Sequence, residues 1–376
     1  MSSSTIHAQV VEWDGNRVRA RIADSRRELG DITVSANVPL DSSPTPWLAA
    51  ALPVAMRLNA PLHLDGPLDA TLLEAAPAIT GILSGWHRTL SSVAVTADSS
   101  ERPRNTATGI GCFFSGGVDS FYSAFVLRER ITHLIFVHGF DIGIRETEVA
   151  DRAMDANREI ADRLGIELIE VRTDIRRMSD RWADWGLIYH GAAMALIGLL
   201  LSPVLREVVV PSSWCLDELR PWGSHPELDP LWTSGQVRFV HHGVEARRTD
   251  KVAAIADSRV AMDHLRVCWQ NRDGSYNCGR CEKCVRTVLN LHAVGARGRC
   301  TTLPADINPE HIRRMRLSRN AQTHARENLT RIEELTDTDP ELLTALAVAI
   351  RRGDLHGPID TARTRTRQLI TQAIRR

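Results

Sequence analysis

The chain has 376 residues, which predicts about two to three domains, since a typical domain holds roughly 100–200 residues. The 46 Lys and Arg residues balance the 46 Asp and Glu residues, and this zero net charge disfavours a polybasic nucleic-acid-binding protein and an acidic solvating protein. A hydrophobic content of 43% with 24% charged residues is ordinary for globular domains and argues against general disorder.

The sequence has no segment typical of secretion or membrane insertion. Residues 1–15 lack a basic stretch followed by an apolar one, so no signal peptide is expected. The longest uncharged apolar run, residues 191–205, is shorter than the ~20 residues that span a bilayer, and it predicts a buried helix. A cytoplasmic protein without a membrane partner is the expectation.

The first region, residues 1–104, has the pattern of a small α+β domain. Asp14 and Gly15 form a turn signal between two short apolar segments, which predicts a hairpin. The polar stretch at residues 97–108 contains a proline and is interpreted as a linker. The expected elements are strands at 8–11 and 17–22, a helix at 69–86 and a strand at 92–96.

The second region, residues 105–302, alternates short apolar segments with amphipathic ones. This pattern predicts βαβ crossovers and a doubly wound parallel sheet. The third region, residues 303–376, is expected to form a helical tail that docks on the body or on a second subunit, with helix breaks at Pro340 and at 353–358. The expected elements of the second region are strands at 110–114, 133–138, 167–171 and 207–210 and helices at 121–130, 148–164, 192–201 and 252–261.

A glycine-containing loop joins the first strand of the second region to its first helix. The adjacent Gly116 and Gly117 permit a tight backbone path, and the helix start adds unsatisfied N–H donors and the positive end of a dipole. Ser115 and Ser120 supply hydroxyl donors. The loop therefore predicts an anion cradle, best suited to phosphates.

Asp119 would repel bare phosphate, so its presence in the loop indicates a magnesium ion between carboxylate and phosphates. The segment has neither the Lys-Ser/Thr pair of a Walker A loop nor a G-x-G-x-x-G pattern, so a P-loop NTPase or a nicotinamide site is not supported. The alternative is a tight strand-to-helix turn capped by Asp or Ser.

The run from Ser115 to Ser120 (SGGVDS) resembles the SGGxDS signature of the PP-loop ATP pyrophosphatase superfamily, over residues 109–284. The resemblance implies a HUP-like α/β domain that cleaves ATP between its α- and β-phosphates. It implies that Val137 and His138, at the end of the second strand, border the adenine. It further implies nucleotide and magnesium contacts at Phe114, Ser115, Gly116, Gly117, Asp119 and Ser120, with Ser115 and Asp119 acting in catalysis.

Four of the seven cysteines crowd into 17 positions, as Cys268, Cys278, Cys281 and Cys284. Two-residue spacings let a turn aim several sulfurs at one ion, and the distant fourth cysteine closes a tetrahedral thiolate site. Zinc in a structural role is the preferred interpretation, because no ligand position looks open, with an iron–sulfur cluster as the alternative. Arg280, Lys283 and Arg286 could offset the thiolate charge or form an exposed basic face.

This spacing after a PP-loop domain resembles the 7-cyano-7-deazaguanine synthase family, as does the segment at 144–148 followed by that at 161–165. The family's Asp-Tyr-Gly-Gln run is replaced here by the segment at 138–141. The family also lacks such an N-terminal region and such a helical tail. We therefore expect the protein to be a relative of this synthase family that acts on a different acceptor substrate.

Lys251 is one of only two lysines among 46 basic residues, and it stands at a predicted helix start with Thr249 or Asp250 as N-cap. A cation near the positive end of the helix dipole is unfavourable. This placement motivates the hypothesis that Lys251 makes a catalytic contact to a phosphate or to the adenylate. The alternative is a solvated surface lysine. Trp214, Trp222 and Trp232 could stack on a planar substrate or simply pack in the interior.

The motifs together predict an ATP-dependent ligase that adenylates a carboxylate or amide oxygen, releases pyrophosphate and transfers the acyl group to ammonia or an amine. The expected cofactors are ATP, Mg²⁺ and Zn²⁺. The acceptor is a small molecule or a protein or peptide carboxyl, a nucleic-acid partner is disfavoured, and a homodimer is compatible with the tail. The alternatives are a tRNA or nucleobase sulfur transferase, using Cys112, Cys215 or Cys300, and a non-catalytic nucleotide-sensing adaptor.

Overall fold

The computed structural model describes residues 4–101, 105–271, 274–336 and 338–354. The chain divides into two compact units, Met1–Ala246 and Arg247–Arg376. Each unit has its own hydrophobic core.

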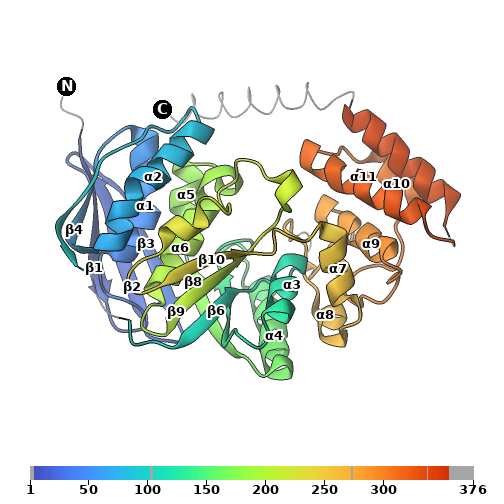
Figure 1. Ribbon diagram of the computed structural model, residues 1–376, viewed down its shortest axis with the longest axis horizontal. Helices are drawn as coiled ribbons and strands as arrows, with labels where there is room; N and C mark the ends of the chain where they lie inside the picture. Colours follow the sequence, from blue (N-terminus) through green and yellow to red (C-terminus); the bar gives the residue numbers. More distant parts are fainter. Residues whose placement is uncertain (1–3, 102–104, 272–273, 337, 355–376) are drawn as a thin grey trace. The chain divides into compact units, whose positions relative to one another are not determined.

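A ten-stranded sheet runs through the first unit in the order β10-β9-β6-β7-β8-β3-β2-β1-β4-β5 (Figure 1). Six of the nine neighbouring strand pairs are parallel and three are antiparallel. The α/β class and the mostly parallel sheet are therefore as predicted. The strands are β1 (Ile6–Trp13), β2 (Arg17–Asp24), β3 (Glu28–Ala36), β4 (Leu62–Asp69), β5 (Val95–Glu101), β6 (Gly109–Phe113), β7 (His133–His138), β8 (Glu167–Thr173), β9 (Leu205–Pro211) and β10 (Arg238–His242).

Helices cover both faces of the parallel part of the sheet. Phe113 and Ile135 lie in the core that also contains the buried side chains of α1 and α6. Cys112 and Leu134, the preceding residues, are also buried and point to the opposite face, where α3 and α4 contact the strands. The elements of this unit are α1 (Thr45–Leu58), α2 (Ala70–Trp86), α3 (Val118–Val126), α4 (Thr147–Leu164), α5 (Arg176–Trp182), the π-helical turn η1 (Trp185–Tyr189), α6 (His190–Leu200) and the 3₁₀ turns η2 (Leu216–Glu218) and η3 (Asp229–Trp232).

The chain order reverses between β6 and β9. From β6 the chain passes to β7 and β8 on one side, then crosses to β9 and β10 on the other. Because β9, β6 and β7 are parallel, their carboxyl ends meet at the same edge. Ligands of open α/β sheets bind in the crevice at such a reversal. The glycine loop directly follows β6 and so stands at this position.

The N-terminal region shares the sheet of the α/β region. β3 pairs with β8 in antiparallel fashion from Val34 to Ala36, so the backbone ladder continues across both. The expected boundary near residue 105 therefore does not separate the two units. The polar stretch expected as a linker at 97–108 begins inside β5, an edge strand for which polar side chains are typical, and its residues 102–104 lie outside the described part.

The helix α1 was not visible in the sequence pattern because of its prolines. Pro46 lies in the first turn, where its missing N–H costs no hydrogen bond, and Pro53 lies inside the helix. Twelve consecutive residues, from Thr45 to Met56, are nevertheless buried. Tertiary burial outweighs the local cost of the interior proline.

The second unit joins the Cys segment to the helices that follow it. Its core contains Val285 and Leu289 of α9, Ile312 of α10, Ile332 of α11 and residues of a helical segment at 340–354. The chain therefore divides after Ala246 and not near residue 303, and the expected break at 353–358 lies mostly outside the described part. Its helices are α7 (Arg248–Ala256), α8 (Arg259–His264), α9 (Glu282–Ala293), α10 (Pro309–Arg314) and α11 (Arg319–Glu333).

Among the described residues, no single helix is long and apolar enough to cross a membrane. The pair Arg176–Trp182 and Trp185–Leu200 reaches the required length and hydropathy only together, and it bends by 108° at its break.

Asp69 is a buried carboxylate that connects three segments of the first unit. Its side chain is the N-cap of α2, since Oδ1 accepts from the N–H groups of Thr71 (2.9 Å) and Leu72 (3.2 Å). Oδ2 accepts from Gly235 N–H at 2.9 Å, and the Asp69 N–H donates to Thr45 Oγ1 at 3.0 Å. One residue thus links α1, α2 and the loop before β10.

We expect Asp69→Ala to lower the free energy of unfolding by about 2–4 kcal/mol, because it removes a cap and leaves buried donors without acceptors. Urea titration followed by circular dichroism measures the change. Asp184→Ala is the control, since Asp184 caps one turn through Leu187 N–H on an exposed site, and it should cost about 1 kcal/mol or less. Equal losses in the two variants would contradict the linking role of Asp69.

Candidate functional site

The glycine loop turns sharply between β6 and α3. Gly116 has φ of +74°, in the left-handed region that favours glycine, and Gly117 is the N-cap of α3 with φ of −85°. The N-terminal end of α3 therefore opens directly onto the loop, as an anion site requires. This conformation agrees with the turn expected from the two adjacent glycines.

The two serines of the loop differ in their surroundings. Ser115 is exposed, whereas Ser120 is buried and donates its hydroxyl to the carbonyl of Gly117 at 3.0 Å. Asp119 lies half-buried in the first turn of α3, between them along the chain. Ser115 is thus directly accessible, and the Ser120 hydroxyl would have to rotate to reach a ligand.

Phe114 anchors the loop to the sheet. Its N–H donates to the carbonyl of Ile135 in β7 at 2.8 Å, which extends the parallel ladder by one residue past β6. Its ring meets Phe121 of α3 edge-on with centroids 4.9 Å apart. Because Phe114 is buried, its side chain supports the loop, and only its backbone could face a ligand.

Val137 and His138 end β7, at the same sheet edge as the glycine loop. Val137 is half-buried and His138 is buried, and His138 Nε2 donates to the carbonyl of Gly143 at 3.1 Å. Burial lowers the pKa of His138 despite this hydrogen bond, so the neutral imidazole is favoured. The next residue, Gly139, has φ of +114°, and a Cβ there would lie 1.9 Å from the carbonyl oxygen of Thr173. No other residue fits at that position.

The loop after β9 lies beside the glycine loop along the same edge. Ser212 is buried and donates its hydroxyl to the carbonyl of Trp214 at 2.7 Å, whereas Ser213 is exposed. Trp214 packs edge-on against Trp222, with the Arg220 guanidinium 3.8 Å above its ring. Of the three tryptophans considered for stacking on a substrate, Trp232 is fully buried and belongs to the core of the first unit. Trp214 and Trp222 instead contact each other.

Sequence reasoning missed a buried polar chain near β10. Asp229 Oδ2 accepts from the Ser224 hydroxyl at 2.6 Å and lies 2.7 Å from His241 Nδ1. The side chains of His241 and Asp229 are 3% and 2% exposed. The sequence contains no spacing signal for this contact, because 12 residues separate the partners and the η3 turn brings them together.

Lys251 belongs to the second unit, in the first turn of α7, whereas Ser115 and Asp119 belong to the first unit. It is 2% exposed, so the alternative of a solvated surface lysine is wrong. The N-cap of α7 is Arg247 and not Thr249 or Asp250 as expected, and the Asp250 side chain accepts from the Arg247 N–H at 3.2 Å.

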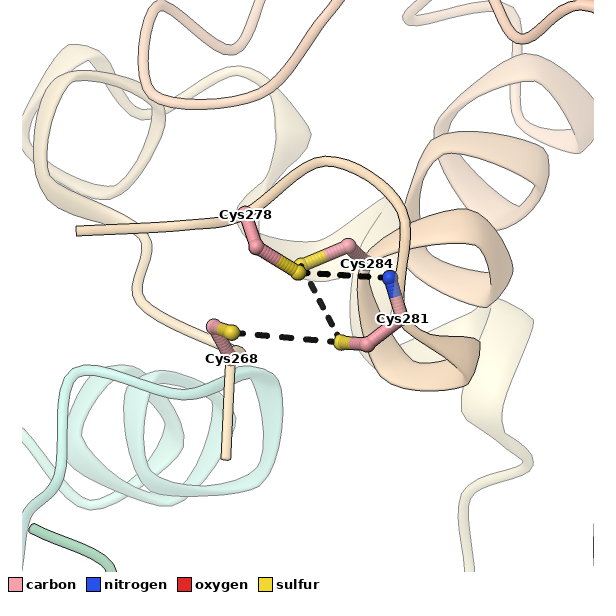
Figure 2. A group of neighbouring side chains, drawn as sticks. All are labelled: Cys268, Cys278, Cys281 and Cys284. Carbon is pink, nitrogen blue, oxygen red and sulfur yellow. Dashed lines mark hydrogen bonds between the residues drawn. The ribbon is translucent and has the colours of Figure 1, made fainter. Parts of the chain in front are cut away.

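The four predicted metal ligands, Cys268, Cys278, Cys281 and Cys284, converge in the second unit (Figure 2). All four Sγ atoms lie within 4.8 Å of one another. The Sγ separations are 3.4 Å for Cys281–Cys284, 3.9 Å for Cys281–Cys268 and 4.0 Å for Cys278–Cys284. Thiolates bound to one tetrahedral ion at about 2.3 Å lie about 3.8 Å apart. The group could therefore hold a single metal ion, whereas the thiolates of a multi-iron cluster bind different irons and are spaced more widely.

Local backbone features bring these thiols together. Gly279 has φ of +66° between Cys278 and Cys281, and the N–H of Cys281 donates to Cys278 Sγ at 3.3 Å. Cys281 is the N-cap of α9, so Cys284 lies in its first turn, where the helix dipole favours negative charge.

Asn277 holds the distant Cys268 in place. Its Oδ1 accepts from the N–H groups of Val267 (2.9 Å) and Cys268 (3.1 Å). Its Nδ2 donates to the carbonyl of Leu265 at 2.8 Å. Asn277 thus clamps the segment that carries Cys268.

The thiols share protons unevenly. Hydrogen bonding, from Cys284 first, lowers the pKa of Cys281 to about 5, and the same contact raises the pKa of Cys284. Burial raises the pKa of Cys278. The Cys281 sulfur is thus charged at neutral pH while Cys278 and Cys284 keep their protons, and a divalent cation would replace those protons. Arg286 Nε lies 3.5 Å from Glu282 on α9, which favours a helix-surface ion pair over charge compensation at the sulfurs.

Comparisons with protein-family models, with curated proteins and with solved structures found no match. The glycine loop and the cluster of four cysteines are therefore the features of the chain that bear on its function.

We expect purified protein to contain one equivalent of metal and Cys281→Ser to lose it. Because metal binding is coupled to folding, the variant should lose about 3 kcal/mol or more of stability in the second unit. Elemental analysis and thermal unfolding measure both effects. Cys300→Ser is the control, since Cys300 is a buried thiol of the same unit outside the cluster. Full metal content in Cys281→Ser would contradict the assignment.

Proposed function

We propose that the chain is an ATP pyrophosphatase-type ligase of the PP-loop class, which forms AMP and pyrophosphate. One observation carries the proposal: the segment SGGVDS at 115–120 leaves a buried parallel strand at the reversal of strand order and enters a helix N-terminus. An anion site at this position is favoured by the N–H donors of the helix start and by the general placement of ligands in open α/β sheets.

The residues of the loop have separate roles in this proposal. The backbone N–H groups at Gly116 and Gly117, with the Ser115 hydroxyl, bind the pyrophosphate portion of ATP. The Asp119 carboxylate holds Mg²⁺, which neutralises charge on the phosphates. The backbone at Val137 and His138 borders the adenine, and the neutral state of His138 avoids a charge against the base.

The proposed reaction has two steps. A carboxylate or amide oxygen of the acceptor attacks the α-phosphorus of ATP, which forms a new P–O bond and breaks the bond to the β-phosphate oxygen, so that pyrophosphate leaves with its electron pair. Ammonia or an amine then attacks the activated carbon, AMP leaves, and the nitrogen loses a proton. The loop contributes by positioning and by charge stabilisation. The acceptor is a small carboxylic acid, such as a deazapurine acid, or a protein or peptide carboxyl.

Lys251 is proposed to contact a phosphate or the adenylate. A lysine that is 98% removed from solvent is costly unless it meets negative charge or strong hydrogen-bond acceptors. Its place in the first turn of α7, against the helix dipole, adds to that cost.

The Cys cluster is proposed to hold zinc in a structural role. Four thiolates complete a tetrahedral site and leave no position for a substrate. The ion would connect Cys268 to the start of α9, whose residues Val285 and Leu289 belong to the core of the second unit.

Sulfur transfer is the less favoured alternative. It needs a reactive thiolate, but burial raises the pKa of Cys112 to about 12 and its thiol donates to the carbonyl of Phe113 at 3.6 Å. Cys215 and Cys300 are also buried, at 6% and 4% exposure. A persulfide carrier is accessible and has a low thiol pKa.

Substrate-dependent exchange of pyrophosphate into ATP, measured over a panel of carboxylic acids and amides, tests the reaction. We expect AMP and pyrophosphate as products, and Asp119→Ala should lower kcat/KM by at least about 100-fold, since it removes the carboxylate that holds Mg²⁺. Asp155→Ala is the control, because Asp155 is an exposed acid on α4. ADP formation would contradict the PP-loop mechanism, and ATP binding without turnover would favour the nucleotide-sensing adaptor.

Two glycine substitutions distinguish the role of the loop in ATP binding from the cost of backbone strain. Gly116 (φ +74°) and Gly165 (φ +67°), which ends α4, both adopt the left-handed conformation, so Ala at either site should cost about 1–2 kcal/mol. Only Gly116→Ala should weaken ATP binding by about tenfold or more, since only this glycine shapes the proposed phosphate site. Fluorescent-nucleotide titration measures the affinity. Equal ATP affinity in both variants would exclude the loop as the phosphate site.

A further inference from the structure

Two histidines and two aspartates meet on the outer side of three neighbouring strands in the first unit. His7 comes from β1, His63 and Asp65 from β4, and Asp98 from β5. The strands are parallel, and the register places His7 directly opposite His63. Because side chains alternate along a strand, His63 and Asp65 share one side while Leu64 between them points into the core.

The ligand atoms of His7, His63 and Asp65 lie within 4.8 Å of one another, close enough for one ion, and Asp98 lies beside them. His7 Nδ1 lies 2.9 Å from Asp65 Oδ1, which lies 3.8 Å from His63 Nε2. His63 Nε2 is also 3.0 Å from Asp98 Oδ1. Nitrogen and oxygen ligands bound at about 2.0–2.1 Å to a tetrahedral ion lie about 3.3–3.4 Å apart, in the middle of this range.

A neighbouring hydroxyl orients the central imidazole. His63 Nδ1 lies 3.0 Å from Thr96 Oγ1, and the strand register places Thr96 directly opposite His63. When Nδ1–H donates to this hydroxyl, the lone pair of Nε2 points towards the two carboxylates. Metal-binding histidines usually carry such a partner on the second ring nitrogen. The His63 side chain is 24% exposed, so its ring is held by its surroundings.

A backbone hydrogen bond orients the Asp98 carboxylate. Asp98 Oδ2 accepts from the N–H of Gly66 at 2.8 Å, which fixes the Asp98 carboxylate while its other oxygen faces His63. The His7 and His63 rings meet edge-on with centroids 5.2 Å apart. Two imidazoles with the Asp65 carboxylate form a donor set that suits zinc or nickel, and it is chemically distinct from the four thiolates of the second unit.

We propose that His7, His63 and Asp65 bind a divalent transition-metal ion that ties β1 and β4 together near the edge of the sheet, with the Asp98 carboxylate of β5 beside His63. The site is independent of the proposed ligase activity and of the Cys cluster. Its ligands come from the paired strands β1 and β4, so occupancy stabilises the N-terminal part of the first unit.

Calorimetric titration of Ni²⁺ into the tag-free, full-length protein tests the site, because Ni²⁺ favours imidazole and carboxylate ligands over a tetrahedral thiolate site already filled by its own metal. We expect one equivalent to bind beyond the metal retained on purification, and the thermal unfolding temperature to rise. His63→Ala should weaken binding by at least about 100-fold, and Thr96→Val, which removes only the orienting hydroxyl, by about tenfold.

Two further variants keep the outcome decisive. Asp65→Asn preserves shape and should weaken Ni²⁺ binding without unfolding the metal-free protein, which circular dichroism checks. His133→Ala is the matched control, since His133 faces Glu167 at 3.5 Å across β7 and β8 in the same sheet, as a histidine–carboxylate pair without a second histidine. Wild-type affinity in His63→Ala and Asp65→Asn, or no second equivalent in the wild type, would overturn the proposal.

Discussion

The parallel pairing of β6 with both β7 and β9 is the constraint on which the first unit depends. β6 lies between β9 and β7, which the chain places on opposite sides of it, and all residues of β6 are buried. The backbone hydrogen bonds to both neighbours leave only its carboxyl end free, where the glycine loop turns into α3. Phe114 extends the ladder to Ile135 and packs on Phe121, so the loop rests on a part of the molecule that has little freedom to move. An anion site needs this rigidity, because its N–H donors must point at one place before the ligand arrives.

The sheet extends far beyond this centre because β3 pairs with β8. This antiparallel contact joins a meander of β1, β2 and β3 and the parallel strands β4 and β5 to the α/β part. The helices α1 and α6 pack together in one core that crosses the junction. The N-terminal region therefore belongs to the same sheet as the strands that carry the glycine loop. Its outer side carries the group of His7, His63, Asp65 and Asp98.

The second unit combines a cluster of four thiols with a hydrophobic core of its own. The Cys cluster lies at the start of α9, and the same helix continues into the core shared with α10, α11 and the segment at 340–354. Cys281 marks the transition, because it caps α9 and contacts two other thiols. The arrangement of the four thiols is thus coupled to the packing of the helices that follow, which had been expected to dock as a tail on the body or on a second subunit.

The sequence by itself determined the features that depend on local chemistry. Gly116 and Gly117 dictate the turn after β6, the spacing of Cys278, Cys281 and Cys284 brings three thiols to one helix start, and the alternation of apolar segments predicts the βαβ order. Only the tertiary structure decided contacts between distant segments. The pairing of β3 with β8, the burial of Lys251 and the meeting of His7 with His63 depend on strand order and packing, and no local pattern encodes them. The physical reason is range: turns and ligand spacings act over a few residues, whereas sheet order is set by which faces can be buried together.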